Sequence, residues 1–141
     1  MENKAVIIDA TRSPIGIKNG EMVGIRPDDL AAQVVKGLME RNNKVTSDQV
    51  EDLVMGCAFP EGPQGMLIGR SVVALAGLPQ TVPAKVVNRF CGSAMDALHQ
   101  VSTAIESGDI EVGIAAGIED MFSIPPGGFA PDFHPELAEQ E

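Results

Sequence analysis

Cys91 is the residue whose position in the sequence best suits covalent chemistry. The apolar run 83–87 predicts a strand, and apolar residues recur with helical spacing after Ala94. Cys91 therefore lies where a strand gives way to a helix. The first turn of a helix has unpartnered N–H groups and a positive dipole end, which lowers the pKa of a cysteine thiol there. Gly92 allows close approach of a substrate to a sharp turn, as in a nucleophile elbow. We therefore consider Cys91 a candidate nucleophile.

The alternative for either cysteine is a buried residue that packs as a small hydrophobe. We favour this alternative for Cys57, which lies inside the predicted strand 53–59 with no activating group nearby. The two cysteines form neither a C-x-x-C pair nor the spacing of a zinc site. We therefore expect no metal site and a reducing compartment.

The two histidines are poorly placed to serve as a base for Cys91. His99 lies two turns into the predicted helix, roughly 12 Å along its axis from Cys91, which is too far for a direct hydrogen bond. His134 lies in a tail rich in proline and acidic residues, where we expect a solvated loop. Three polar residues are candidates either to support the site or merely to fix loops: Arg12, Asn88 and Arg89.

The composition excludes several classes of protein. A chain of 141 residues with 44% hydrophobic residues is long enough for a domain with a core and is not disordered. Ten Lys and Arg against 20 Asp and Glu give a formal charge of −10, which argues against a nucleic-acid or anionic-membrane partner. The apolar run near the N-terminus is too short for a signal peptide or a membrane span. We therefore expect an acidic, cytoplasmic protein.

Predicted strands and helices alternate along the chain. The strands are 5–8, 53–59, 82–87 and 112–116. The helices are 27–41, a capped turn at 46–49, 64–77 and 91–108. This order predicts an α/β fold, a mostly parallel βαβ sheet with helices on both faces. The fully apolar strand 5–8 should be central, and the helix after Cys91 should be enclosed on nearly all sides. Ligands bind beyond the carboxyl ends of such strands, so Arg12, Gly62 and Cys91 should share one rim.

Four motifs, in order along the chain, resemble those of the thiolase family. The stretch 87–95 resembles the active-cysteine motif V-N-x-x-C-G-S-G, 9–16 resembles D-A-x-R-T-P-x-G, 117–121 resembles G-G-x-E-x-M, and 63–70 with 76–79 resembles the Q-x-x-N-x-A-R helix. His99 and the stretch 132–135 are similar to bacterial 3-ketoacyl-CoA thiolases in particular. The resemblance covers essentially the whole chain.

This resemblance implies a reaction for Cys91. The cysteine would attack the keto group of a 3-ketoacyl-CoA, acetyl-CoA would leave, and coenzyme A as co-substrate would take the shortened acyl group. The backbone N–H of Cys91 would donate to the oxyanion. The resemblance further implies thiolysis in fatty acid β-oxidation, no tightly bound cofactor, a homodimer or homotetramer, and a subunit of a β-oxidation multienzyme as a further partner.

The sequence departs from the family pattern in several places. Ala94 replaces a Gly or Ser, and Leu67 stands where Asn is common. The family's base histidine, in G-H-P, and its second cysteine, in C-x-G, are absent from these 141 residues. The resemblance therefore implies an N-terminal half, with an α/β half-domain over 1–122 and the start of a loop region over 123–141, that is inactive alone.

Two other interpretations stay open. The first is a non-catalytic, thiolase-like interaction module that pairs with another chain and keeps Cys91 as a relic. The second is a sister enzyme such as a ketoacyl or hydroxymethylglutaryl synthase, whose active motif lacks the V-N-x-x-C-G-S pattern seen here.

Overall fold

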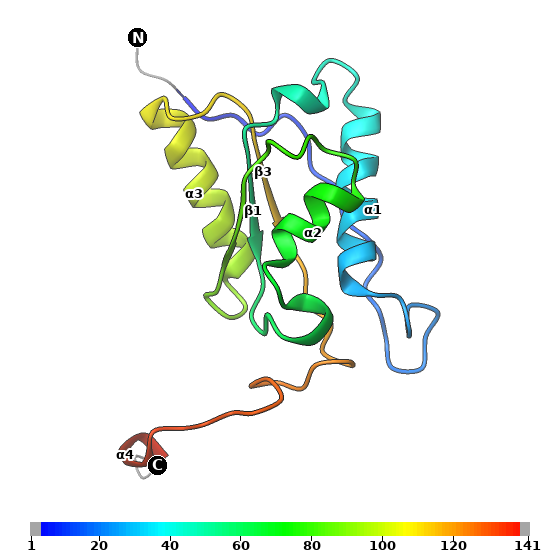
Figure 1. The fold of residues 1–141 in the computed structure, drawn as a ribbon, viewed down its shortest axis with the longest axis vertical. Helices are drawn as coiled ribbons and strands as arrows, with labels where there is room; N and C mark the ends of the chain where they lie inside the picture. The colour runs from blue at the N-terminus through cyan, green and yellow to red at the C-terminus, as the bar shows by residue number, and fades with distance from the viewer. Residues whose placement is uncertain (1–3, 139–141) are drawn as a thin grey trace.

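The computed structural model describes residues 4–138, and a three-stranded parallel sheet forms its centre (Figure 1). Strand β1 (Asp52–Gly56) lies between β2 (Ala84–Val87) and β3 (Gly113–Gly117). Leu53 is paired with Ala84 on one side and with Ile114 on the other. Parallel neighbours require crossover connections, and helices supply them here. The predicted α/β class with a parallel sheet is confirmed.

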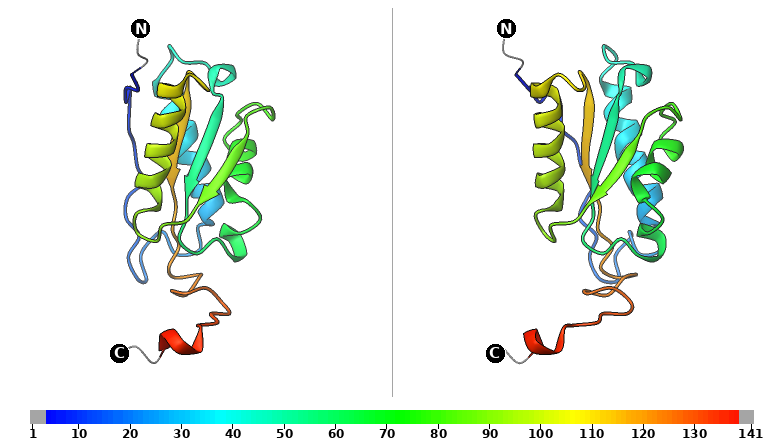
Figure 2. Two further views of the ribbon diagram at one scale, coloured as in Figure 1. Left: turned by 90° about the vertical axis from the view of Figure 1, so that its left-hand side faces the viewer. Right: turned by 60° about the vertical axis from the view of Figure 1, so that its left-hand side comes forward.

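Helices cover both faces of the sheet (Figure 2). Helix α3 (Ser93–Ser107) packs on one face, and α1 (Pro27–Arg41) and α2 (Ile68–Leu75) pack on the other. Strand β1 feeds both cores, because its successive side chains point to opposite faces. Leu53 and Met55 pack with the α1 and α2 residues, whereas Val54 packs against α3, and all three are 0% exposed. The short helices are η1 (Ser47–Gln49), η2 (Gly62–Gln64) and α4 (Pro135–Ala138).

The boundaries of two helices agree with the local sequence signals. Helix α1 has the predicted limits, with a proline at its start and Asn42 as its C-cap. The predicted capping box precedes η1, where the N–H of Thr46 donates to the Gln49 side chain at 2.9 Å. Helix α2 starts later than predicted. Residues 62–64 form η2 instead, and Met66 and Leu67 then have positive φ angles, which an α-helix does not allow. Within residues 4–138, no helix is long and apolar enough to cross a membrane.

Helix α3 begins at Ser93 rather than at Cys91. The N–H groups of Gly92 and Ser93 are bonded within a turn, to the carbonyls of Arg89 and Phe90, both at 3.0 Å. The expectation that this helix is enclosed on nearly all sides is wrong for the described residues. Ser93 and two other α3 residues are buried, but Met95 is 58% exposed, because the sheet covers only one side of the helix.

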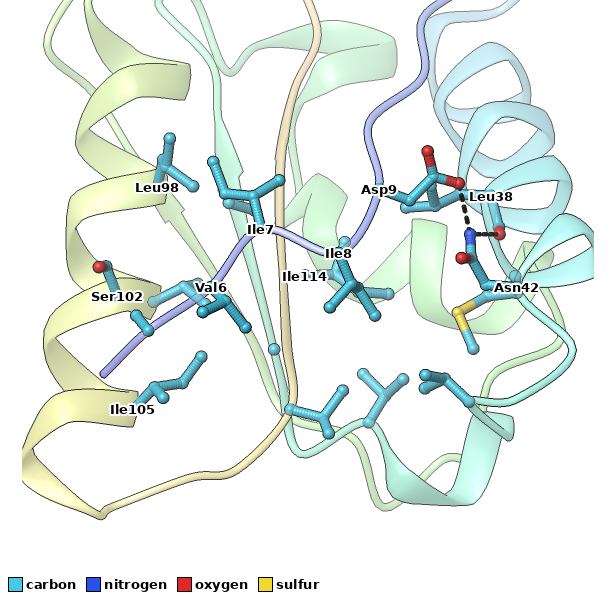
Figure 3. Close-up of a pocket in the computed structure, with 18 of the residues that line it drawn as sticks. Val6, Ile7, Ile8, Asp9, Leu38, Asn42, Leu98, Ser102, Ile105 and Ile114 are labelled. Carbon is cyan, nitrogen blue, oxygen red and sulfur yellow. Dashed lines mark hydrogen bonds between the residues drawn. The ribbon is translucent and has the colours of Figure 1, made fainter. Parts of the chain in front are cut away.

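The predicted central strand 5–8 is also wrong. Residues 4–10 form no strand, and the described residues give them no place in the sheet, whose centre is β1. The segment instead passes the free edge of β3 from α3 to α1 and bounds an apolar cavity of about 330 Å³ (Figure 3). Val6 and Ile7 remain 73% and 71% exposed. An apolar run has strand propensity, but its place in a sheet depends on the backbone groups that pair with it.

Candidate active site

The loops that follow the three strands meet at one rim of the sheet. Asn88, after β2, donates its side-chain N–H to the carbonyl of Ala58, after β1, at 2.8 Å. The N–H of Ala58 donates to the carboxylate of Glu119, after β3, at 2.7 Å. The turn that carries Cys91 follows β2, and the ring centroid of its Phe90 lies 6.1 Å from that of Phe59, which follows β1. The short helix η2, which begins at Gly62, also follows β1 (Figure 1). Arg12 lines a pocket together with Glu119. The predicted rim is therefore present.

Cys91 is exposed on the turn formed by residues 89–92, here called the Cys91 turn. Hydrogen bonds hold this turn on both sides of Cys91. Before it, the N–H of Phe90 donates to the side-chain oxygen of Asn88 at 3.0 Å. After it, the buried Ser93 hydroxyl accepts from the N–H of Arg89 at 2.8 Å and donates to the carbonyl of Phe90 at 2.6 Å. Phe90 itself has a left-handed backbone, with φ of 47°. The thiol thus projects from a fixed corner between β2 and α3, which fits the geometry of a presented nucleophile.

Cys57 has the opposite environment. It lies just beyond β1 instead of within the strand, and it is 1% exposed. Burial, followed by the nearby negative charge of Glu119, raises the pKa of the Cys57 thiol to about 11. The Glu119 carboxylate oxygen lies 4.0 Å from its sulfur. A thiol in such a site is almost entirely protonated near neutral pH, so the structural interpretation of Cys57 is confirmed.

Two glycines that sequence reasoning missed allow α3 to start so close to the sheet. A Cβ on Gly56, at the end of β1, would lie 2.4 Å from the backbone nitrogen of Ala94. A Cβ on Gly117, at the end of β3, would lie 2.6 Å from the Cβ of Ala94. These distances are far below van der Waals contact. The approach of α3 to the sheet, and with it the Cys91 turn, therefore requires glycine, which has no side chain, at both positions. The available signal was a glycine inside the predicted strand 53–59 and another directly after the predicted strand 112–116, since glycine in a strand marks close approach of another backbone.

Three further polar candidates are Arg89, His99 and His134. Arg89 pairs with Asp96 on α3 at 2.9 Å, with 71% of its side chain exposed. His99 lies on α3 and borders the cavity of Figure 3, which the Cys91 turn does not line. His134 is exposed in the C-terminal tail. Among residues 4–138, no hydrogen bond joins either histidine side chain to the Cys91 turn, as the sequence led us to expect.

The chain is similar in sequence to known proteins of one family. Residues 5–129 match the family model described as "Thiolase, N-terminal domain". The chain is 44% identical over 134 residues to a 3-ketoacyl-CoA thiolase of Aliivibrio salmonicida, an alignment that covers 94% of this chain and 34% of that protein. It is 44% identical over 119 residues to a beta-ketoadipyl-CoA thiolase of Pseudomonas putida, covering 84% and 30%.

A solved structure agrees with these relatives. The acetyl-CoA acetyltransferase of Bacillus anthracis superposes with a TM-score of 0.78 at 29% identity, covering 85% of this chain and 30% of that chain. The chain therefore spans about a third of the length of the proteins that it matches.

Proposed function

This chain belongs to the thiolase family, and we propose that Cys91 is the nucleophile of an acyl-CoA acyltransferase. The observation that carries the proposal is an exposed thiol on a fixed turn directly before α3, at the rim where three strands end. The only other cysteine is buried and has a raised pKa, so it is unsuited to attack a substrate.

The proposed reaction is thiolysis of a 3-ketoacyl-CoA in two steps. The Cys91 thiolate bonds to the 3-keto carbon, the bond between C2 and C3 breaks, and the departing acetyl-CoA carbanion takes up a proton. The sulfur of coenzyme A then bonds to the acyl carbon, its proton passes to a base, and Cys91 leaves as thiolate. The backbone N–H of Cys91 is the proposed donor to the oxyanion in both steps.

The proton carriers of this reaction must come from residues outside these 141. The thiolase pattern supplies a histidine in G-H-P and a cysteine in C-x-G, and neither motif occurs in this sequence. We therefore propose that residues 1–122 form the N-terminal α/β half-domain of the enzyme, that 123–141 open its loop region, and that this chain alone does not turn over. Coenzyme A is polyanionic, whereas this chain has a formal charge of −10, so further residues must also bind the coenzyme.

The wider assignment rests on the names of the relatives and on the resemblance to the thiolase family. They are called 3-ketoacyl-CoA and beta-ketoadipyl-CoA thiolases, which supports a 3-ketoacyl-CoA substrate. The proposed role in fatty acid β-oxidation rests on the family resemblance alone. We propose a cytoplasmic homodimer or homotetramer that uses coenzyme A as a co-substrate without a tightly bound cofactor. A subunit of a β-oxidation multienzyme is a further proposed partner.

A non-catalytic interaction module is the second candidate. The observation in its favour is a group of large apolar side chains left exposed near the rim, because such surfaces commonly contact other proteins. The group includes Met66, Phe90, Met121 and Phe122, which are 96%, 66%, 54% and 61% exposed. In that case Cys91 would be a relic, and the chemistry of its thiol would be dispensable.

The test is Cys91→Ser in a protein that also contains the base histidine and the second cysteine. Loss of the nucleophile should lower thiolysis of a 3-ketoacyl-CoA by on the order of 10⁴-fold or more, with an unchanged circular dichroism spectrum. The matched control is Cys57→Ala, which removes the buried thiol and should keep most of the activity. Retained turnover in the Cys91 variant would eliminate the nucleophile assignment, whereas a native protein without any thiolase activity would favour the interaction module.

A further inference from the structure

We infer that Glu119 is a positioning residue for Cys91 and acts through Ala58 and Asn88. The inference rests on the proposed role of Cys91 and gives a purpose to two motifs that this role leaves unused, 63–70 and 117–121. Glu119 has no direct hydrogen bond to the Cys91 turn, so any effect on the thiol must pass through intermediate contacts.

The first step is the cluster of donors around the Glu119 carboxylate. Its two oxygens accept from the N–H of Ala58 at 2.7 Å, from the N–H of Phe59 at 3.2 Å and from the side-chain amide of Gln64 at 2.9 Å. Hydrogen bonds to an ionised acceptor are about twice as strong as those between neutral groups. Glu119 therefore fixes the backbone immediately after β1.

The second step is the Gln64 amide, which holds Glu119 in place. Gln64 is 0% exposed, and each polar atom of its side chain has a partner. Its nitrogen donates to the carbonyl of Phe59 at 2.9 Å as well as to Glu119, and its oxygen accepts from the N–H of Asp120 at 2.5 Å. A fully satisfied buried network of this kind is rigid, because every alternative arrangement leaves a buried group unpaired.

The third step leads from Ala58 to the thiol. The carbonyl of Ala58 accepts from the Asn88 amide at 2.8 Å, and the oxygen of that amide accepts from the N–H of Phe90 at 3.0 Å. Phe90 precedes Cys91 and has a left-handed backbone, a conformation that a bulky residue keeps only when its surroundings enforce it. Loss of Glu119 should therefore let the Phe90 backbone relax and move Cys91 away from the start of α3.

The negative charge of Glu119 and its positioning role should have opposite effects on the alkylation rate of Cys91. The direction in which the rate changes therefore distinguishes the two roles. A nearby carboxylate disfavours a thiolate, so a purely electrostatic role predicts faster alkylation of Cys91 when the charge is removed. A positioning role predicts slower alkylation, because the thiol leaves the fixed, exposed corner between β2 and α3.

The experiment compares Glu119→Gln with the unaltered 141-residue chain. Mass spectrometry gives the rate at which iodoacetamide modifies Cys91 at pH 7 and at pH 9, and amide hydrogen exchange reports on Phe90. We expect alkylation to slow by about threefold to tenfold at both pH values, since one lost hydrogen bond is worth about that factor. Exchange at Phe90 should accelerate, whereas exchange in β1 should stay unchanged. The matched control is Glu61→Gln, which affects a single bond to the N–H of Phe129 and should behave like the native chain.

A second pair of variants tests the route and guards against misfolding. Asn88→Asp removes the donor to the Ala58 carbonyl, and in that background Glu119→Gln should cause no further slowing. Glu119→Asp keeps the charge but shortens the side chain, and it should also slow alkylation. Unchanged or faster alkylation in both Glu119 variants, or additive effects with Asn88→Asp, would overturn the inference. Neither readout needs acyl transfer, so these results are independent of the Cys91→Ser assay.

Discussion

Three large residues in the connections that follow β1 and β2 have a left-handed backbone, which L-residues normally avoid. Met66, Leu67 and Phe90 have φ of 49°, 59° and 47°. Each such conformation costs about 1–2 kcal/mol for a residue other than glycine. Met66 and Leu67 delay the start of α2, and Phe90 turns the chain into Cys91. Strain of this kind gathers at sites where geometry matters more than stability.

Leu67 offers a direct measurement of this strain. Asn tolerates the left-handed region better than Leu, and Leu67 is 48% exposed, so little apolar contact is lost on exchange. We expect Leu67→Asn to raise the free energy of unfolding by about 0.5–1 kcal/mol, measured as a higher urea midpoint. The control is Leu75→Asn, which is 52% exposed at the end of α2 and should destabilise instead. A loss of stability in the Leu67 variant would contradict the strain argument.

The two thiols should differ sharply in reactivity. The raised pKa of Cys57, about 11, and its burial leave almost no accessible thiolate at pH 8, whereas Cys91 is exposed. We expect iodoacetamide to modify Cys91 at pH 8 and to leave Cys57 unmodified until the protein is unfolded in urea, as read from peptide masses. Equal rates in the native protein would show that the region around Cys57 opens readily.

At the scale of elements, the position of Cys91 depends on how closely α3 approaches the sheet. The helix starts against the ends of β1 and β3, where Gly56 and Gly117 leave room for Ala94. Its C-terminal end is a left-handed Gly108 with φ of 83°, so both ends of α3 depend on glycine, for different reasons. The start needs space, whereas the end needs an unusual backbone angle.

Gly56→Ala tests the need for space. The new methyl group would overlap the backbone at Ser93 and Ala94, so we expect a loss of about 2–3 kcal/mol in the free energy of unfolding and altered alkylation of Cys91. The matched control is Gly37→Ala in α1, where a Cβ meets nothing within 4 Å and removal of a helical glycine should stabilise by up to about 1 kcal/mol. If both variants have the same urea midpoint, the contact at Ala94 is not limiting.

At the scale of the whole molecule, one ionic contact ties the N-terminal segment to the α/β body. The Arg41 guanidinium and then the Asn42 amide hold the pKa of the Asp9 carboxyl at about 2, below its ordinary 3.8. The donor atoms lie at the end of α1, and the apolar residues before Asp9 stay largely exposed (Figure 3). The segment is thus held more by this carboxylate than by burial of its side chains.

Acid should release the segment. A carboxyl whose pKa is lower in the folded state stabilises the attachment above its ordinary pKa, and this contribution is lost as the pH falls from about 3.8 to about 2. We therefore expect NMR signals of residues 5–8 to become those of a free chain in that range, before the β1 signals change. In Asp9→Asn the segment should already be detached at pH 7. Attachment that persists in Asp9→Asn would instead indicate that the apolar contacts suffice.

Much of the architecture was predictable from local signals alone. The limits of α1, the capping box before η1 and the strand-to-helix position of Cys91 all follow from patterns within a few neighbouring residues. The place of Cys57 in a buried core followed in the same way, from the absence of any activating neighbour. Such features depend on propensity, periodicity and capping, which neighbouring residues determine.

The remaining features are contacts between distant parts of the chain. The 5–8 run has the composition of a central strand, yet β1 occupies the centre, because strand order depends on which backbones pair. Glu119 reaches Ala58 across 61 positions, and Gly56 makes room for Ala94 on another element. The sequence by itself therefore pointed to Cys91 as the candidate nucleophile, and it determined the strand-to-helix position of this residue and the α/β class. Only the tertiary structure decided what holds that nucleophile in place, because distances between elements are absent from any local pattern.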